Sequence, residues 1–186
     1  MGGTFDPIHL GHLRGAENAR EALGLDEVRF LPAQVPPHRP VPASSARDRY
    51  AMVALATALH PRFVADDLEL RREGPSYTVD TIARVRDERP GDDFVLIVGS
   101  DTFPELSTWK DHDRLFRMCT VAVVTRPDDG GPDPAAPSVD RAQRVPGPGL
   151  AVSATDVRRR VKEGLSIRYL VPDAVADYIA KRGLYR

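Results

Sequence analysis

The chain has 186 residues, which suits one domain spanning 1–186, and its composition is that of an ordinary globular protein. A formal net charge of −1 excludes the global basic field that recruits nucleic acid or an anionic membrane, so an anionic ligand must be bound by a few locally placed groups. The single cysteine, Cys119, excludes an intramolecular disulfide, and we expect it to be a packed thiol. No stretch approaches the ~20 apolar residues of a membrane span, and no secretory signal is evident, so we expect a cytoplasmic protein.

Helical and extended patterns alternate in the first half of the chain. The expected elements are a helix over 12–23 that stops at Gly24, a strand over 27–32, an irregular Pro-rich loop over 36–42, an amphipathic helix over 46–59 and an extended segment over 63–70.

The second half continues the alternation. It predicts a helix over 76–89 with Ser76 as a hydroxyl cap, buried strands over 94–98 and 121–124, short helices over 102–106 and 111–116, a Pro/Gly-rich mobile excursion over 127–149, a helix over 153–163 and a last helix over 172–183.

This alternation favours an α/β fold with a parallel sheet covered by helices on both faces. In such a fold a glycine turn follows a buried strand, yet here only Met1 precedes Gly2 and Gly3. We therefore expect the first, normally central, strand to be missing from this sequence.

The opening turn carries the first chemical signal. Its glycines, Gly2 and Gly3, allow a ligand to approach the backbone closely, and the helix that follows offers free amides and a positive dipole to phosphate. His9 and His12 are three residues apart and lie on the same side of the first helical turn, so both can donate to phosphoryl oxygens. A zinc site is the rival interpretation, but two histidines without a third ligand support it weakly, and we assign no metal ligands.

A second helix start lies far downstream, at Ser153-Ala154-Thr155-Asp156-Val157-Arg158. The hydroxyls of Ser153 and Thr155 can bind phosphate oxygens, and Arg158 adds a donor group that is always charged. The alternative is an ordinary N-cap followed by solvated arginines. Two such helix starts in one chain favour a phosphate-binding role.

Both segments resemble motifs of one family. Residues 3–12 are similar to the GxFxPxHxGH signature of adenylyl- and cytidylyltransferases with a Rossmann-like nucleotidyltransferase fold, and residues 152–158 are similar to that family's I-S-[SA]-T-x-[IV]-R motif. Residues 35–40, 74–81, 99–102 with Trp109, and 178–186 resemble one branch, the nicotinate mononucleotide adenylyltransferases. That branch often has a second aromatic residue after the tryptophan, where this chain has Lys110.

The resemblance implies ATP and nicotinate mononucleotide as substrates, with Mg²⁺ accompanying ATP. It implies that His9, His12 and Arg158 are catalytic, and that the ATP phosphates are bound by Gly2, Gly3, Thr4, Phe5, Arg39, Ser153 and Thr155, with Arg49 supporting Arg39. In the acceptor site it implies that Trp109 stacks on the pyridine, that the backbone of Tyr77 and Thr78 binds the carboxylate, and that Asp101 holds a ribose hydroxyl or orients Mg²⁺.

Three alternatives remain open from the sequence. The acceptor could be nicotinamide mononucleotide or phosphopantetheine, as in other adenylyltransferases of the family. Without its first strand the chain could instead be a non-catalytic nucleotide-binding module. The sequence also leaves open whether the chain forms a homo-oligomer, while nothing in it points to a nucleic-acid or membrane partner.

Overall fold

The computed structural model describes residues 1–37, 40–125, 142–147 and 149–186. In chain order the elements are β1 (Gly2–Gly3), α1 (Leu10–Leu23), β2 (Val28–Pro32), α2 (Ala46–Thr57), β3 (Phe63–Ala65), η1 (Leu68–Arg71), α3 (Thr78–Glu88), β4 (Val95–Gly99), η2 (Phe103–Thr108), α4 (His112–Met118), β5 (Thr120–Thr125), β6 (Ala142–Pro146), α5 (Ala154–Lys162) and α6 (Asp173–Arg182), where η marks a 3₁₀ helix.

Every strand in the described residues pairs in parallel with its neighbours. Hydrogen bonds join them in two three-stranded sheets, β1-β2-β3 and β4-β5-β6. Because β1 also contacts β4, the two sheets lie edge to edge and the strands follow the order 3-2-1-4-5-6. This is the order of a doubly wound Rossmann-type sheet, whose ligands bind beyond the carboxyl ends of the strands.

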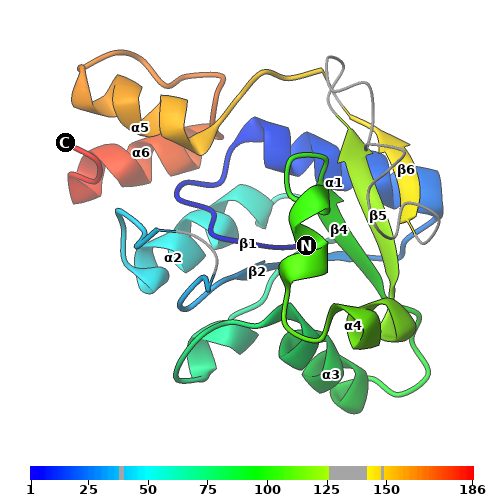
Figure 1. Cartoon of the computed structure of the whole chain (residues 1–186). Helices are drawn as coiled ribbons and strands as arrows, with labels where there is room; N and C mark the ends of the chain where they lie inside the picture. Colours follow the sequence, from blue (N-terminus) through cyan, green and yellow to red (C-terminus); the bar gives the residue numbers. More distant parts are fainter. Residues whose placement is uncertain (38–39, 126–141, 148) are drawn as a thin grey trace.

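The position of the expected missing strand is occupied by β1. This strand has only two residues, with Gly2 opposite Leu31 and Gly3 opposite Pro32 of β2. Figure 1 shows β1 beside β2. The chain therefore enters the turn before α1 from the middle of the sheet, as is usual for this fold, although the strand at that position, β1, is short.

Alternate residues of the strands enter two separate cores. On β4, Ile97 belongs to a core formed with α1, α2 and α6, whereas Leu96 and Val98 belong to a second core formed with η2 and α4. Successive side chains of a strand point to opposite faces, so the two cores lie on opposite faces of the sheet. Figure 1 shows α3 and α4 together on one side of the strands. The prediction of helices on both faces is confirmed.

Glycine residues end helices where the sequence predicts. Gly24 follows α1 and Gly183 follows α6, and both have φ of 63°, in the left-handed region that glycine adopts without steric cost. At the other end of a helix, the Ser153 hydroxyl accepts a hydrogen bond from the Asp156 amide at 3.1 Å and caps α5.

Two predictions for the segment 68–76 are wrong. Residues 68–71 form the 3₁₀ helix η1 rather than extended chain, because the Asp66 carboxylate accepts the Leu68 amide at 2.9 Å and turns the backbone. Ser76 does not cap a helix: α3 begins at Thr78, and the Ser76 hydroxyl accepts the Gln34 amide at 2.9 Å instead.

The predicted excursion over 127–149 is wrong for residues 142–146, which form β6 beside β5. Of this strand only Val145 is fully buried, so an edge strand formed without the continuous apolar run that marks a central one. Most of the remaining excursion, residues 127–141 and 148, lies outside the described residues.

The structure also bears on two expectations drawn from composition, a packed cysteine and the lack of a membrane-spanning stretch. Cys119 is buried against α4, and burial raises the pKa of its thiol to about 11, as expected of a packed cysteine. In the described part of the chain, no helix combines the length and the apolar character needed to cross a membrane.

Candidate active site

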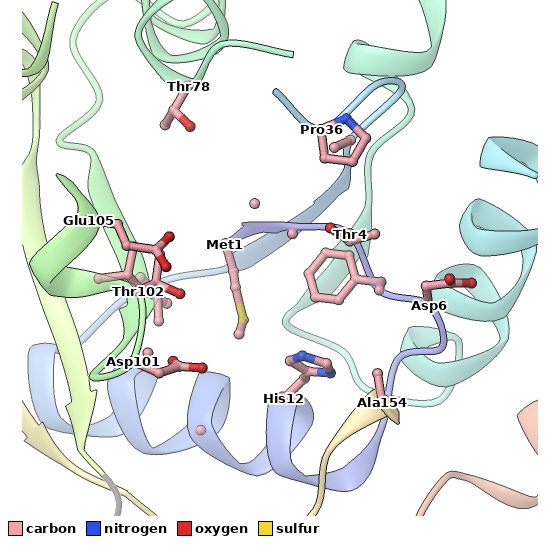
Figure 2. Close-up of a pocket in the computed structure, with 18 of the residues that line it drawn as sticks. Met1, Thr4, Asp6, His12, Pro36, Thr78, Asp101, Thr102, Glu105 and Ala154 are labelled. Carbon is pink, nitrogen blue, oxygen red and sulfur yellow. The ribbon is translucent and has the colours of Figure 1, made fainter. Parts of the chain in front are cut away.

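A cavity of about 650 Å³ opens beyond the carboxyl ends of β1 and β4. Its volume is within the range of small-molecule and cofactor sites. Figure 2 shows side chains from separate segments around this space, among them Thr4 and Asp6 from the turn, His12 from α1, and Asp101 from the segment after β4. The cavity is lined by every described residue predicted to be catalytic or to bind a substrate: Gly2, Gly3, Thr4, Phe5, His9, His12, Tyr77, Thr78, Asp101, Trp109, Ser153, Thr155 and Arg158.

The two histidines cap helix α1 reciprocally. The His12 amide donates to Nδ1 of His9 at 3.3 Å, and the His9 amide donates to Nδ1 of His12 at 3.2 Å. Their rings stack with centroids 3.6 Å apart. The helix therefore begins at Leu10, two residues before the predicted start, because the sequence pattern does not reveal a histidine acting as an N-cap.

This capping fixes the orientation of both rings. An amide can only donate, so each Nδ1 accepts, and in the neutral ring the proton resides on Nε2. Each Nε2 is then a donor on the side of the ring away from the helix amides. His9 is buried and His12 is half-buried. A Cβ at Gly11 would lie 3.1 Å from Nδ1 of His9, so the small residue leaves room for the His9 ring.

Arg158 joins the two predicted phosphate motifs. Its Nη1 donates to the carbonyl of Asp6 at 2.7 Å, and its Nη2 donates to the Thr155 hydroxyl at 3.3 Å. Arg158 is half-buried and lines the cavity. Segments 152 residues apart in the chain thus meet at one side chain.

Arg49 supports the opening turn from α2. It is 1% exposed, and its guanidinium donates to the carbonyls of Thr4 at 2.8 Å and Gln34 at 3.3 Å. Burial lowers its pKa. Arg49 does not line the cavity, so it holds the turn from behind. The prediction for Arg39 lies outside the described residues.

The predicted acceptor side of the cavity contains Tyr77, Thr78 and Trp109. Tyr77 is the N-cap residue of α3, so the first amides of that helix lie at the cavity. Lys110 occupies the place of the second aromatic residue; its Nζ lies 4.7 Å from the centroid of the Tyr77 ring and 2.9 Å from the Asp80 carboxylate.

A buried carboxyl group that the sequence does not mark also lies at this end of the cavity. Glu69 is 6% exposed, lines the cavity and accepts a hydrogen bond from the Thr81 hydroxyl at 2.7 Å. Burial raises its pKa above the ordinary range of a glutamate. No signal in the sequence marks Glu69, because its burial depends on η1 packing against the start of α3.

Comparison with known proteins agrees with this geometry. A family model described as cytidylyltransferase-like matches residues 1–160. A probable nicotinate-nucleotide adenylyltransferase of Thermus thermophilus is 49% identical, and the alignment covers 100% of this chain and 97% of the relative. One of Pseudomonas fluorescens is 45% identical, with 100% and 95% covered. The solved structure of Plasmodium falciparum nicotinic acid mononucleotide adenylyltransferase complexed with NaAD superposes with a TM-score of 0.82 at 18% identity, over 99% of this chain and 94% of that one.

The cytidylyltransferase-like match over residues 1–160, together with the doubly wound sheet and the cavity at its carboxyl edge, places the chain among the nucleotidyltransferases. Within this class, proteins described as probable nicotinate-nucleotide adenylyltransferases are 42–49% identical to this chain, with 100% of the chain covered. The chain belongs to the nicotinate-nucleotide adenylyltransferase family.

Proposed function

We propose that this chain transfers AMP from ATP to nicotinate mononucleotide, giving nicotinate adenine dinucleotide and pyrophosphate in the synthesis of NAD. The observation that carries the proposal is that the N-termini of α1 and α5 meet at one cavity. The hydrogen bond from Arg158 to the Asp6 carbonyl joins them. Helix starts favour anions, and two of them at one cavity suit the joining of two phosphorylated molecules.

The reaction requires little proton chemistry from the protein. A phosphate oxygen of the mononucleotide attacks the α-phosphorus of ATP, a P–O bond forms, and the bond to the leaving pyrophosphate breaks. A phosphate is already nucleophilic at neutral pH, so neither a general base nor a covalent intermediate is needed. Positioning and charge stabilisation are then the main contributions, with Nε2 of His9, Nε2 of His12 and the guanidinium of Arg158 as donors.

The Ser153 and Thr155 hydroxyls and the backbone of residues 2–5 would bind the remaining phosphate oxygens. At the other end, Trp109 offers an aromatic face for the pyridine, and the first amides of α3, at Tyr77 and Thr78, would bind its carboxylate. Lys110 also lies beside Tyr77, paired with the Asp80 carboxylate.

Mg²⁺ would enter with ATP and neutralise charge on the triphosphate. The described residues contain no group of three or more His, Cys, Asp or Glu side chains that could hold a metal ion. Mg²⁺ is usually held by one or two carboxylates together with substrate phosphates, and Asp101 and Glu105 supply carboxylates at the cavity. These residues fit that mode, and Asp101 is also placed to hold a ribose hydroxyl.

Comparison of acceptors tests the proposed function. Pyrophosphate release is measured with MgATP and, in parallel, nicotinate mononucleotide, nicotinamide mononucleotide or phosphopantetheine. We expect nicotinate mononucleotide to give the highest kcat/KM, because the amides at the N-terminus of α3 favour a carboxylate over an uncharged amide. A higher kcat/KM with either other acceptor would reassign the substrate, and ATP binding without turnover of any of them would contradict the proposal.

Replacement of Trp109 by alanine tests the pyridine site. Stacking of a base on an aromatic side chain contributes about 1–3 kcal/mol, so we expect KM for the mononucleotide to rise about tenfold or more while KM for ATP changes little. Trp109→Phe retains an aromatic face and should lose less. Trp109 is the only tryptophan, so quenching of its fluorescence by the mononucleotide offers a direct binding signal in the unaltered protein. Equal increases in both KM values would contradict the assignment.

A further inference from the structure

The segment between β1 and α1, residues 4–9, is called the phosphate turn below. Within it, the Asp6 carboxylate is buried and accepts several hydrogen bonds. It is 5% exposed, and its Oδ1 accepts hydrogen bonds from the Ser44 hydroxyl at 2.5 Å and the Tyr185 hydroxyl at 2.7 Å. Its Oδ2 accepts the Ala43 amide at 2.7 Å. Three donors from two distant segments therefore satisfy one carboxylate.

The same residue is held through its backbone. The Asp6 carbonyl accepts Arg158, and two residues earlier the Thr4 carbonyl accepts Arg49. The turn between β1 and α1 is thus fixed by two guanidinium groups on its carbonyls and by three donors on the Asp6 side chain. Movement of Asp6 would displace both the turn and the guanidinium of Arg158.

Tyr185 reaches Asp6 in an unfavourable backbone conformation. The chain reverses after α6 at Gly183, and Tyr185 has φ of 65°, in the left-handed region that is costly for a residue with a side chain. Such conformations persist where the surrounding contacts hold them, and they cluster at functional sites. Burial raises the pKa of Tyr185, so its hydroxyl remains protonated and donates to Asp6.

Tyr185 and Ser44 do not line the cavity, whereas Asp6 does. Both hydroxyls donate to Asp6, so we expect their effect on a ligand to pass through that carboxylate. Loss of one donor would leave the buried carboxylate less compensated beside the phosphate turn, and it would also release the turn from one of its restraints. Both consequences disfavour a triphosphate.

We propose that Tyr185 and Ser44 are positioning residues for ATP: by holding Asp6 they fix the phosphate turn and Arg158 in the geometry that binds the triphosphate. This inference rests on the proposed function in assigning ATP to the turn. It places a determinant of ATP affinity in the segment after α6, outside the cavity.

The test is Tyr185→Phe, which removes one hydroxyl and keeps the ring. MgATP is titrated into the protein by calorimetry without any acceptor, and nicotinate mononucleotide is titrated separately. We expect Kd for ATP to rise about tenfold and Kd for the mononucleotide to change less than about twofold.

Tyr178→Phe is the matched control. Tyr178 lies on α6 and its hydroxyl donates to a carboxylate, Asp48, at 2.9 Å, but neither residue lines the cavity. We expect this variant to lose comparable thermal stability and to bind ATP like the unaltered protein. Equal weakening of ATP binding in both variants, or a Tyr185→Phe variant that loses only thermal stability, would overturn the inference.

Ser44→Ala provides an independent variant. Its hydroxyl shares Oδ1 of Asp6 with Tyr185, so the two losses should be non-additive when Ser44→Ala and Tyr185→Phe are combined. Fully additive losses would show that the two hydroxyls do not act through Asp6. Because ATP binding is measured without acceptor, failure of the acceptor assay would overturn the proposed function and leave this measurement intact.

Discussion

His12→Ala is expected to lower kcat by about 10²–10³-fold while the chain remains folded. Removal of one donor that stabilises developing charge in a transition state typically has an effect of this size. His12 is the more accessible histidine of the pair, and its Nε2 is the donor left after Nδ1 accepts the His9 amide. The measurement is steady-state pyrophosphate release, with circular dichroism as a check of folding.

A second variant separates catalysis from capping. Alanine also removes the cap on the His9 amide, which has a typical cost of ~1 kcal/mol in stability. In His12→Asn the amide oxygen can take the place of Nδ1, so we expect the cap to remain and the rate to fall as in alanine. His112→Ala, which alters a histidine outside the cavity, should retain the full rate. Near-normal kcat in His12→Asn would show that His12 only caps the helix.

Arg158→Lys is expected to lower kcat/KM for ATP by about 10²-fold, and Arg158→Ala by more. Arginine presents several donors in a fixed plane, and here one guanidinium holds the Asp6 carbonyl and the Thr155 hydroxyl together while it faces the cavity. The single ammonium of lysine keeps the charge but cannot reproduce this bridge. Kinetics at varied ATP concentration check the prediction.

The control for this prediction lies next in the sequence. Arg159 is half-exposed and pairs with Asp156 and Glu163 on the outer face of α5. Arg159→Lys should therefore leave kcat/KM for ATP within about twofold of the unaltered chain, since exposed ion pairs contribute little. If Arg158→Lys also keeps kcat/KM for ATP within about twofold, the arginines of α5 are only a solvated surface, which is the alternative interpretation of this motif.

Most of the fold was predictable because its signals are local. The continuous apolar run at 94–98 and the glycines after α1 and α6 reflect burial and backbone geometry that need no knowledge of distant residues. The wrong prediction at Ser76 reflects a competing hydrogen bond from a distant part of the chain. Ser76 binds the Gln34 amide, which comes from a segment 42 residues away, and this choice is invisible in the sequence around Ser76.

The sequence indicated which residues line the cavity. It did not indicate which hydrogen bonds hold these residues in place. The motif residues His9, His12 and Arg158 lie there as predicted, and their roles in catalysis remain predictions. Their bonds were not predictable: the reciprocal cap depends on backbone amides, and the bond between Tyr185 and Asp6 joins residues 179 positions apart. Asp6 was inside the recognised motif, but its partners come from elsewhere in the chain.

The buried cysteine provides a practical means of observing this site. Burial raises the pKa of the Cys119 thiol to about 11, so the thiol stays protonated at neutral pH, whereas reagents that modify thiols attack the thiolate. A cysteine introduced at an exposed position near the cavity, such as Thr108 beside Trp109, would then be the one reactive thiol in the described chain. A fluorophore attached there could follow ligand arrival without prior removal of the native cysteine.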